Sequence, residues 1–591
     1  MDMPHTPSLD SRMDRDTSSY QTEPETYGDL IVRYLSVAGV NHIFGVPGGS
    51  IEPFFDAVAR AERSGSGPTM VVSRHETGAA FMADGSIRES GRLGVCCSTT
   101  GPGATNLITG VANAYEENLP LLVLTAQTPR AKFGRKTLQD SSCSAIDVVG
   151  MFNHCTKYST LVSHPDQLKH KLINALLIAN TAPKGPVHLS LPADIVNTAL
   201  SEPLRINPDL FNQTLQLNSP MAMEQLKTKL YEAERILIYV GENCHLTSDQ
   251  LTQFADQTNA AIISEPTGKC WVDETHPRYC GVFGFSGHPK ARALIMEQQY
   301  DLLLALGTQA GELGTSGWEP KLLNNKMVHI DDNSAAFMQT PEACLHVCGS
   351  LPEILTQLST HAAILRSQGK QWQDLRQSVS SIPMLSLEEQ AAATNNAVPI
   401  KPQRVMHTLS QALPDNTRIF IDAGNAWAWS IRYMQRRDNR GLFRIAMAYG
   451  SMTWAISASV GSAVSNPKAP HICITGDGSY LMSGQEITVA AQLNLPLVMI
   501  ILNDNALGMV KHGQRLGGAE QTGFALPEIN FALMAEAMGI EGIVVESPRE
   551  LEAVDFTRLF AKRGPTIIDV RIDPEEVPPM GERIKGLATS K

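Results

Sequence analysis

Residues 472–480 read ICITGDGSY and residues 498–510 read VMIILNDNALGMV, and these two stretches decide the fold. Each begins with an apolar run of strand length and continues into a turn that carries a carboxylate, Asp477 in the first and Asp504 in the second. The stretch between the two turns has room for one helix, expected over 480–493. The two strands are therefore expected to be parallel neighbours.

The carboxyl ends of neighbouring parallel strands meet at one edge of a sheet, where α/β proteins bind ligands. Asp477 and Asp504 are expected to converge there on one hard cation, and Mg²⁺ prefers such oxygen ligands. Gly476 and Gly478 allow close approach of a phosphate, which the N-terminus of the expected helix would also favour. Taken alone, GDG and NDN are each typical of a plain turn. Their spacing and strand context together predict a site for a metal and a phosphate.

Short apolar runs alternate with helical stretches over the rest of the chain from Tyr27. Runs that are continuously apolar predict parallel sheets covered by helices on both faces. The expected fold class is therefore α/β, with three doubly wound parallel-sheet units. The expected strands are 70–73, 93–98, 119–126 and 187–191, then 236–240, 261–264, 302–306 and 328–330, and finally 419–421, 472–475, 497–502 and 566–570.

The expected domain organisation follows these groups of strands. Residues 1–26 are acidic and polar and lack the apolar segment of a signal peptide, so they are expected to form a disordered leader. A mobile tail or lid is expected at the C-terminus. The boundaries are 27–200 for the N-terminal unit, 215–360 for the central unit, 361–400 for a linker, 401–575 for the C-terminal unit and 576–591 for the tail.

Composition excludes other classes of protein. Of 591 residues, 43% are hydrophobic and 18% charged, which is typical of a globular chain. The net charge of −12 argues against nucleic acid or an anionic membrane as the main partner. Ten cysteines without a CxxC pair indicate reduced thiols, and a cytoplasmic enzyme is expected. No apolar run reaches the roughly 18 residues of a membrane span.

Five further segments occur in the order found in one enzyme family. They are FGVPGGS (44–50), SRHETGAA (73–80), STTGPGATNLITGVANA (98–114), KGPVHLSLPADI (184–195) and GSMTWAISASVGSA (450–463). With the first two motifs, the chain from Tyr27 to Ile572 resembles the thiamine diphosphate enzymes of the acetolactate synthase type. The resemblance implies a pyrimidine-binding N-terminal unit, a central unit and a diphosphate-binding C-terminal unit, with thiamine diphosphate and Mg²⁺ as cofactors.

The resemblance also implies a set of site residues. Asp477, Asp504 and the backbone carbonyl of Ala506 are expected to bind Mg²⁺. The family usually has Asn where this chain has Asp504, so Asn503 is an alternative ligand. The residues expected to bind the cofactor are Pro47, Gly48 and Glu76 in the first unit and Gly424, Asn425, Ser451, Met452, Gly476, Asp477, Gly478, Ser479, Asp504 and Met509 in the third.

Glu76 is the expected catalytic residue. In the family, a carboxyl group at this position binds the aminopyrimidine ring and activates the cofactor, and a dry pocket that raises its pKa suits that role. The alternative is a glutamate that only stabilises the first turn of a helix through the helix dipole. In the family this glutamate and the metal site come from different subunits, which implies a homodimer or homotetramer with shared active sites.

Three departures from the family bear on the substrate. Gly513 stands where acetolactate synthases have Trp, and Cys143-Ser144 replaces an expected Phe-Gln, with Gln139 nearby as a substitute. The central unit reads GTQAGELGTSGW (307–318) in place of the family's flavin motif. The central unit is therefore expected to bind FAD, ADP or no nucleotide, with FAD disfavoured.

The expected activity is decarboxylation of a 2-oxoacid and transfer of the acyl carbon to a carbonyl acceptor, which forms a 2-hydroxyketone (acyloin). The alternatives are a decarboxylase or C–C lyase that does not ligate, and a non-catalytic homologue that binds the cofactor. A nicotinamide dehydrogenase is disfavoured because no GxGxxG opens a unit. His75, Lys511 and His512 are candidates for binding the substrate carboxylate.

Overall fold

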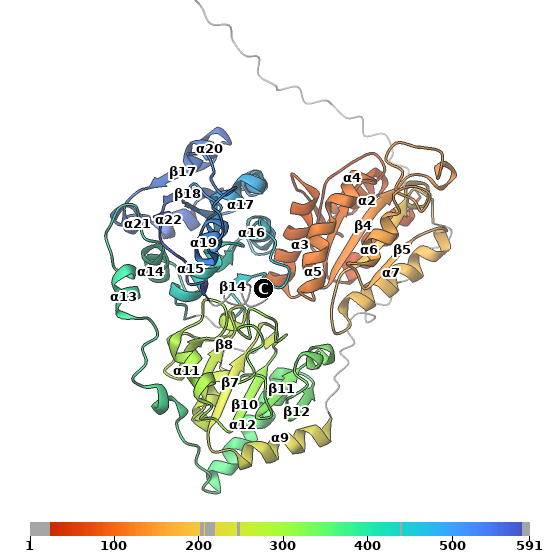
Figure 1. Cartoon of the computed structure of the whole chain (residues 1–591). Coiled ribbons are helices and arrows are strands. Elements are labelled where there is room, and N and C mark those ends of the chain that lie inside the picture. The colour runs from red at the N-terminus through yellow and green to blue at the C-terminus, as the bar shows by residue number, and fades with distance from the viewer. Residues whose placement is uncertain (1–23, 201–205, 207–218, 245–248, 438–439, 582–591) are drawn as a thin grey trace, which may run out of the picture.

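The computed structural model describes residues 24–200, 206, 219–244, 249–437 and 440–581. It contains three six-stranded sheets, all with parallel pairing, and each forms one lobe with its helices (Figure 1). The expected α/β class with three parallel-sheet units is confirmed. Nearly all of the expected leader and residues 582–591 of the expected tail lie outside the described residues.

The first sheet has the order β2-β1-β3-β4-β6-β5. Its strands β3, β4 and β6 are wholly buried, as continuous apolar runs require. The strands are β1 (His42–Gly45), β2 (Thr69–Val72), β3 (Gly94–Ser98), β4 (Leu121–Gln127), β5 (Tyr158–Leu161) and β6 (Val187–Pro192). The helices are α1 (Tyr27–Val37), α2 (Glu52–Arg63), α3 (Glu76–Ser90), α4 (Pro102–Asn106), α5 (Ile108–Glu116), α6 (Val148–Asn153), α7 (Pro165–Asn180) and α8 (Ala193–Val196).

The central sheet has the order β12-β11-β10-β7-β8-β9. The strands are β7 (Ile236–Val240), β8 (Ala261–Ser264), β9 (Tyr279–Val282), β10 (Leu302–Leu306), β11 (Met327–Asp331) and β12 (Leu345–Cys348). The helices are α9 (Pro220–Glu232), α10 (Gln250–Thr258), α11 (Pro289–Glu297), α12 (Leu351–Ser367) and α13 (Leu387–Ala393). Helix α12 runs through the boundary expected at 360, because its buried Leu355, Leu358 and Ala362 belong to the central core.

The third sheet has the order β14-β13-β15-β16-β18-β17. The strands are β13 (Arg418–Ile421), β14 (Phe443–Ile445), β15 (His471–Gly476), β16 (Leu497–Asn503), β17 (Glu541–Val545) and β18 (Thr566–Arg571). The helices are α14 (Pro402–Ala412), α15 (Asn425–Tyr433), α16 (Trp454–Ser465), α17 (Asp477–Ser483), α18 (Ile487–Gln492), α19 (Gly508–Gly517), α20 (Phe531–Ala537), α21 (Pro548–Glu552) and α22 (Phe556–Ala561). Strands β15 and β16 pair in parallel with Gly476 opposite Leu502, so the two motif strands are neighbours as expected.

The helix expected over 480–493 is wrong in its extent. Helix α17 begins at Asp477, a short 3₁₀ turn (Gly484–Glu486) follows, and α18 continues from Ile487. The backbone leaves the helical region at Ser483, where φ is −150°. The start of α17 at Asp477 puts the aspartate itself in the first helical turn, at the carboxyl edge of the sheet.

The first and third units share one strand order and pack against each other through α3 and α16. The contact is reciprocal. A Cβ on Gly85 would lie 1.8 Å from the carbonyl oxygen of Ala458, and a Cβ on Gly461 would lie 1.8 Å from that of Met82. Only glycine allows these backbones to approach so closely. We infer that an approximate two-fold axis relates the two units within the chain.

Charged side chains add to this interface. Glu89 of α3 accepts from Arg418 and Arg444 of the third unit, at 2.9 and 2.7 Å. Asp84, which is wholly buried, accepts from the indole Nε1 of Trp454 at 3.0 Å. These contacts hold the first unit against the third. The carboxyl edges of their two sheets therefore have fixed positions relative to each other within one chain.

Strands missed from the sequence are mostly edge strands. Strands β5, β12 and β17 are only partly buried, so their sequences lack a continuous apolar run. Strand β14 has only three residues, and β1 and β9 contain His or Gly. None of the helices within the described ranges is both long and apolar enough to cross a membrane.

Candidate active site

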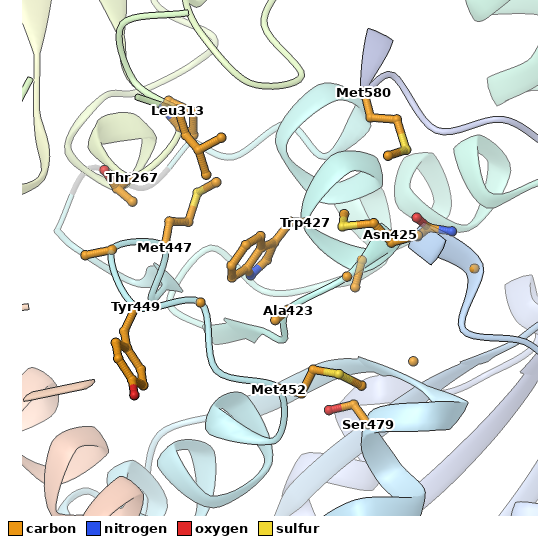
Figure 2. Close-up of a pocket in the computed structure, with 18 of the residues that line it drawn as sticks. Thr267, Leu313, Ala423, Asn425, Trp427, Met447, Tyr449, Met452, Ser479 and Met580 are labelled. Atoms are coloured by element: carbon orange, nitrogen blue, oxygen red, sulfur yellow. The ribbon is translucent and has the colours of Figure 1, made fainter. Parts of the chain in front are cut away.

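A cavity of about 1170 Å³ lies between the carboxyl edge of the third sheet and the central unit. Its walls come from the loops after β13, β14, β15 and β16, from α19, from the loops after β7, β8 and β10 of the central unit, and from residues 116–118 at the end of α5. Figure 2 shows Met452 and Ser479 on one side, Leu313 and Thr267 of the central unit on another, and Trp427 between them. Its size suits a cofactor together with a small substrate.

Asp477 lies on the wall of this cavity, directly after β15. Its two carboxylate oxygens accept the backbone N–H groups of Gly478 at 2.7 Å and Ala506 at 3.3 Å. Burial raises the pKa of Asp477 to about 6, and these hydrogen bonds oppose the rise. The side chain is therefore fixed in direction by the backbone of both motif loops.

Asp504 faces the same cavity from the loop after β16. Burial raises the pKa of Asp504 to about 7, and the charge of Asp477 contributes to the rise. A Cβ on Gly508 would lie 2.6 Å from an Asp504 oxygen and 2.4 Å from the amide nitrogen of Asn425. The side chains of Asp504 and Asn425 thus both approach the backbone at Gly508, where a residue other than glycine would clash with them.

Asn503, the alternative metal ligand, does not face the cavity. Its amide donates to the backbone oxygen of Ile529 at 3.2 Å and to Asp569 at 2.9 Å, inside the core. Asn503 is the last residue of β16 and points into the core, whereas Asp504, the first residue of the loop that follows, lines the cavity. Of this pair, only Asp504 is placed to bind a metal.

The donor set fits a magnesium ion better than a soft metal. Nowhere in the described ranges do three His, Cys, Asp or Glu side chains form a metal-binding group. Two carboxylates and the backbone of Ala506 lie together on the cavity wall instead. Mg²⁺ commonly takes one or two protein carboxylates and fills its shell with phosphate oxygens and water.

The loops beside the pair form a cradle. Gly424, with φ of +125°, precedes α15, whose first residue Asn425 keeps a buried side-chain oxygen without a partner. The N-terminus of α15 suits a bound anion such as a diphosphate, whereas the Asn425 oxygen, which can only accept a hydrogen bond, needs a donor such as a water molecule beside it. Met452 lies across the cavity and is 36% exposed.

Asp422 holds this cradle from behind. It is wholly buried and accepts the backbone N–H groups of Thr453 and Ala455 at 3.1 and 3.2 Å. It also accepts the hydroxyl of Ser479, which in turn accepts the N–H of Thr453 at 2.8 Å. Ser479 is thereby committed to the loop that presents Met452, so its role is to position that loop.

The structure brings most of the predicted site residues together on this cavity. Those that line it are Gly424, Asn425, Met452, Gly476, Asp477, Gly478, Ser479, Asp504, Ala506 and Met509. Ser451 lies between two lining residues, and its hydroxyl is buried without a partner.

Glu76, Pro47 and Gly48 do not line the cavity. They lie at the carboxyl edge of the first sheet, where Glu76 accepts the amide of Asn106 at 3.0 Å. A Cβ on Gly103 would lie 3.2 Å from the other Glu76 oxygen, so the GPG loop packs on this carboxylate. Glu76 is in the first turn of α3, capped by the His75 ring, which accepts from Thr77 at 3.2 Å. One chain therefore holds two separate half-sites.

Sequence reasoning missed the acidic end of the cavity. The carboxyl groups there are Glu116, Glu117, Glu242, Glu265 and Glu312. Burial raises the pKa of Glu242 well above its ordinary value, and the charge of Glu117 adds to this. Glu265 could have been predicted from the sequence, because it directly follows β8, just as Asp477 directly follows β15. The others come from loops whose meeting only the tertiary structure decides.

Of the positions that depart from the family pattern and the candidates for binding the substrate carboxylate, some line the cavity and others do not. Gly513 lines the cavity, and a Cβ on Gly513 would lie 4.0 Å from the Cε methyl carbon of Met580. Met580, within the expected tail, is 4% exposed. Lys511 forms an ion pair with Glu575 at 2.7 Å, and His512 is buried. Neither residue lines the cavity. Gln139 packs on Gly101 of the GPG loop, at the edge that carries Glu76.

Comparisons with known proteins agree with this division into units. Three family models match: the thiamine pyrophosphate enzyme N-terminal TPP binding domain over residues 25–148, the central domain over 223–358 and the C-terminal TPP binding domain over 422–570. A probable acetolactate synthase large subunit of Methanocaldococcus jannaschii is 30% identical over 93% of each chain.

Two further relatives have the same extent. An acetolactate synthase of Arthrospira platensis is 30% identical over 91% of this chain and 92% of its own. The acetolactate synthase isozyme 1 large subunit of Escherichia coli is 27% identical over 93% of this chain and 94% of its own.

Proposed function

The chain belongs to the thiamine pyrophosphate enzymes of the acetolactate synthase type, and from this premise we propose that it decarboxylates a 2-oxoacid and joins the remaining acyl carbon to a carbonyl acceptor. The product would be a 2-hydroxyketone. The chain is a thiamine diphosphate-dependent enzyme, and the carboxylate pair on the cradled cavity is the observation that carries the rest of the proposal.

Magnesium would be held by Asp477, Asp504 and the Ala506 backbone. The diphosphate would lie between them and the N-terminus of α15, at Gly424 and Asn425. Met452 would support the ring system, with Ser479 and Asp422 fixing its loop. When bound, the cofactor supplies a carbon nucleophile and an electron sink for loss of CO₂.

Glu76 would serve the cofactor of a second copy of the chain. The carboxyl edge of the first sheet is separate from the cavity of the same chain, and the α3–α16 contact fixes that separation. A two-fold dimer allows each Glu76 to meet the other chain's cavity. We therefore propose a homodimer, or a homotetramer built from such dimers, in which Glu76 exchanges a proton with the cofactor ring.

The central unit does not fit FAD. The end of the cavity that it contributes presents Glu242, Glu265 and Glu312. Among the described residues, no lysine, arginine or histidine lines the cavity. A dinucleotide diphosphate there would meet several carboxyl groups, and the nearby cation, Arg88, is already paired with Glu117 and Glu242. We propose that the enzyme works without flavin, and a purified holoenzyme without flavin absorbance is the expected result.

A panel of 2-oxoacids, supplied with thiamine diphosphate and Mg²⁺, tests the proposed reaction. Expected are release of CO₂ and formation of an acyloin when a carbonyl acceptor is present. An aldehyde as sole product would favour the alternative, a decarboxylase that uses a proton as acceptor. Absence of CO₂ from every 2-oxoacid, with both cofactors shown to be bound, would contradict the proposal.

The ten cysteines bear on the location of the enzyme. All of them are free in the described structure. Unpaired, mostly buried thiols are typical of a reducing compartment, so we propose a cytosolic location.

A further inference from the structure

The carboxyl groups of the cavity are only partly offset by their own chain, in which Arg88, outside the lining, pairs with Glu117 at 3.0 Å and Glu242 at 3.4 Å. Seven carboxyl side chains line the cavity, and no basic side chain does among the described residues. The whole chain is also negative, with a net charge of −12. Mg²⁺ and the anionic diphosphate would largely offset each other. A 2-oxoacid is an anion, so this field would repel it at the entrance.

Unpaired positive charge lies on the other half-site. The segment after β4, residues 130–140, carries Lys132, Arg135 and Lys136. All three are exposed, and within the described part of the chain none has a side-chain hydrogen bond or ion pair. The basic residue at the start of the segment, Arg130, is paired with Asp194 at 2.8 Å. We call residues 130–140 the basic loop.

The backbone of the basic loop is held in place by hydrogen bonds. Gly134 and Ser142 donate their N–H groups to Asp140, at 3.1 and 3.0 Å. The hydroxyl of Thr100 donates to the backbone oxygen of Gln139 at 2.9 Å, and Gln139 packs on Gly101. The loop is thereby attached to the GPG segment, which in turn packs on Glu76.

The basic loop also carries an exposed apolar residue. Leu138 is 85% exposed in the single chain. This leucine follows the row of cations, and the loop is attached through Gln139 to the segment that packs on Glu76, so the loop is placed to meet the negative cavity of a second copy.

We propose that Lys132, Arg135 and Lys136 form a capture site for the carboxylate of the incoming 2-oxoacid at the mouth of the partner's cavity. The proposal rests on the shared active site of the proposed function and adds its means of recognising the substrate. Loss of CO₂ requires that the carboxylate not be held tightly at the reacting position. A site on an exposed loop therefore acts on entry, and it raises kcat/KM without raising kcat.

The test compares two triple variants that remove the same charge. Lys132→Gln/Arg135→Gln/Lys136→Gln removes the capture site, and Arg63→Gln/Lys169→Gln/Lys468→Gln removes three exposed charges elsewhere. The donor is the 2-oxoacid of the panel with the highest kcat/KM. Methyl acetylphosphonate, an anionic 2-oxoacid mimic that cannot lose CO₂, is the binding probe for the holoenzyme.

For the loop variant we expect kcat/KM to fall about tenfold, with kcat within about twofold of the parent. The calorimetric Kd of methyl acetylphosphonate should rise by a similar factor, and the decrease of kcat/KM with salt should flatten. Thiamine diphosphate binding should not change. KM and Kd equal to those of the control variant overturn the capture site, as does a parent holoenzyme that does not bind the probe.

A mixed dimer tests whether the loop acts on the other chain. One chain carries the triple loop substitution and the other carries Asp477→Ala, so the only complete cavity faces an intact loop. We expect the parent KM at that site. A raised KM would place the loop at its own chain's cavity and overturn the proposal. If the parent releases no CO₂ from any 2-oxoacid, the proposed function itself fails, which is a different result.

Discussion

Asp477 and Asp504 are two largely buried carboxyl groups that face the same cavity, and the charge of Asp477 raises the pKa of Asp504. Their pKa values of about 6 and 7 lie well above the ordinary range, chiefly because of burial. Protein groups do not fully relieve this, because backbone N–H groups lower both pKa values and the charge of Lys511 lowers that of Asp504, yet both values stay raised. A bound divalent cation would relieve it, which is the physical reason to place magnesium there.

Substitution Asp477→Ala removes one of the two carboxylates. We expect the Kd of thiamine diphosphate, measured by calorimetry in the presence of Mg²⁺, to rise more than about 100-fold. Asp415→Ala, an exposed aspartate of the same unit, is the control and should bind as the parent does. Equal affinity in the Asp477 variant would remove the metal site from the account.

Glu486 predicts a pH dependence of stability that is separate from the metal site. It is wholly buried, and burial raises its pKa to about 7, although it accepts the N–H of Arg74 at 3.0 Å. The native state therefore binds the proton more tightly than the unfolded state does. The free energy of unfolding should fall as pH rises from about 4.5 to about 7, by up to about 3 kcal/mol.

Glu486→Gln should reduce this dependence, because the amide mimics the protonated carboxyl; the part due to Asp477 and Asp504 should remain. The measurement is the thermal midpoint of the apoprotein at pH 5 and at pH 7.5. Glu536→Gln, which changes an exposed carboxyl, should keep the parental slope. If the parent and the Glu486 variant lose the same stability between the two pH values, Glu486 is not the source.

At the scale of elements, the α3–α16 contact determines where the half-sites lie. The backbone approach at Gly85 and Gly461 allows no side chain, since each Cβ position is 1.8 Å from a carbonyl oxygen. Because this contact joins two units of one topology, it sets the carboxyl edge of one sheet apart from that of the other. Placing both half-sites in one cavity therefore needs a second chain.

Gly461→Val should separate the two helices. We expect a loss of several kcal/mol from overpacking, seen as a lower thermal midpoint, and weaker dimer formation at the same protein concentration. Gly517→Ala adds a methyl group into open space and should be neutral for stability. An unchanged midpoint in the Gly461 variant would mean that the close approach does not exist in solution.

Sequence patterns predicted elements well where the signal was local. Buried runs such as 236–240, 261–264 and 302–306 coincide with β7, β8 and β10, because a strand buried on both faces has to be continuously apolar. The helix after β15 was wrong in extent because its break at Ser483 depends on packing around Tyr480, which lies against Gly484. Edge strands were missed because half-buried strands have mixed composition.

At the scale of the whole molecule, the candidate site also has some residues that the local sequence predicts and others that only tertiary packing brings to the cavity. Asp477, Asp504 and Gly478 were predictable because each follows its strand directly. Glu117 and Glu242 were not, because they come from different units, and only the packing of those units places them on one cavity. Sequence alone also could not show that Glu76 lies apart from the cavity of its own chain. That separation leads to the central claim, an active site shared between two chains.

The most direct measurement of that claim is the activity of an isolated heterodimer of Glu76→Gln and Asp477→Ala chains, purified through two different tags. Each homodimer should be nearly inactive. The heterodimer has one site with both an intact Glu76 and an intact metal pair, so it should recover about half of the parental kcat. A heterodimer as inactive as the two homodimers, although it is folded and binds one equivalent of thiamine diphosphate, would contradict the shared site.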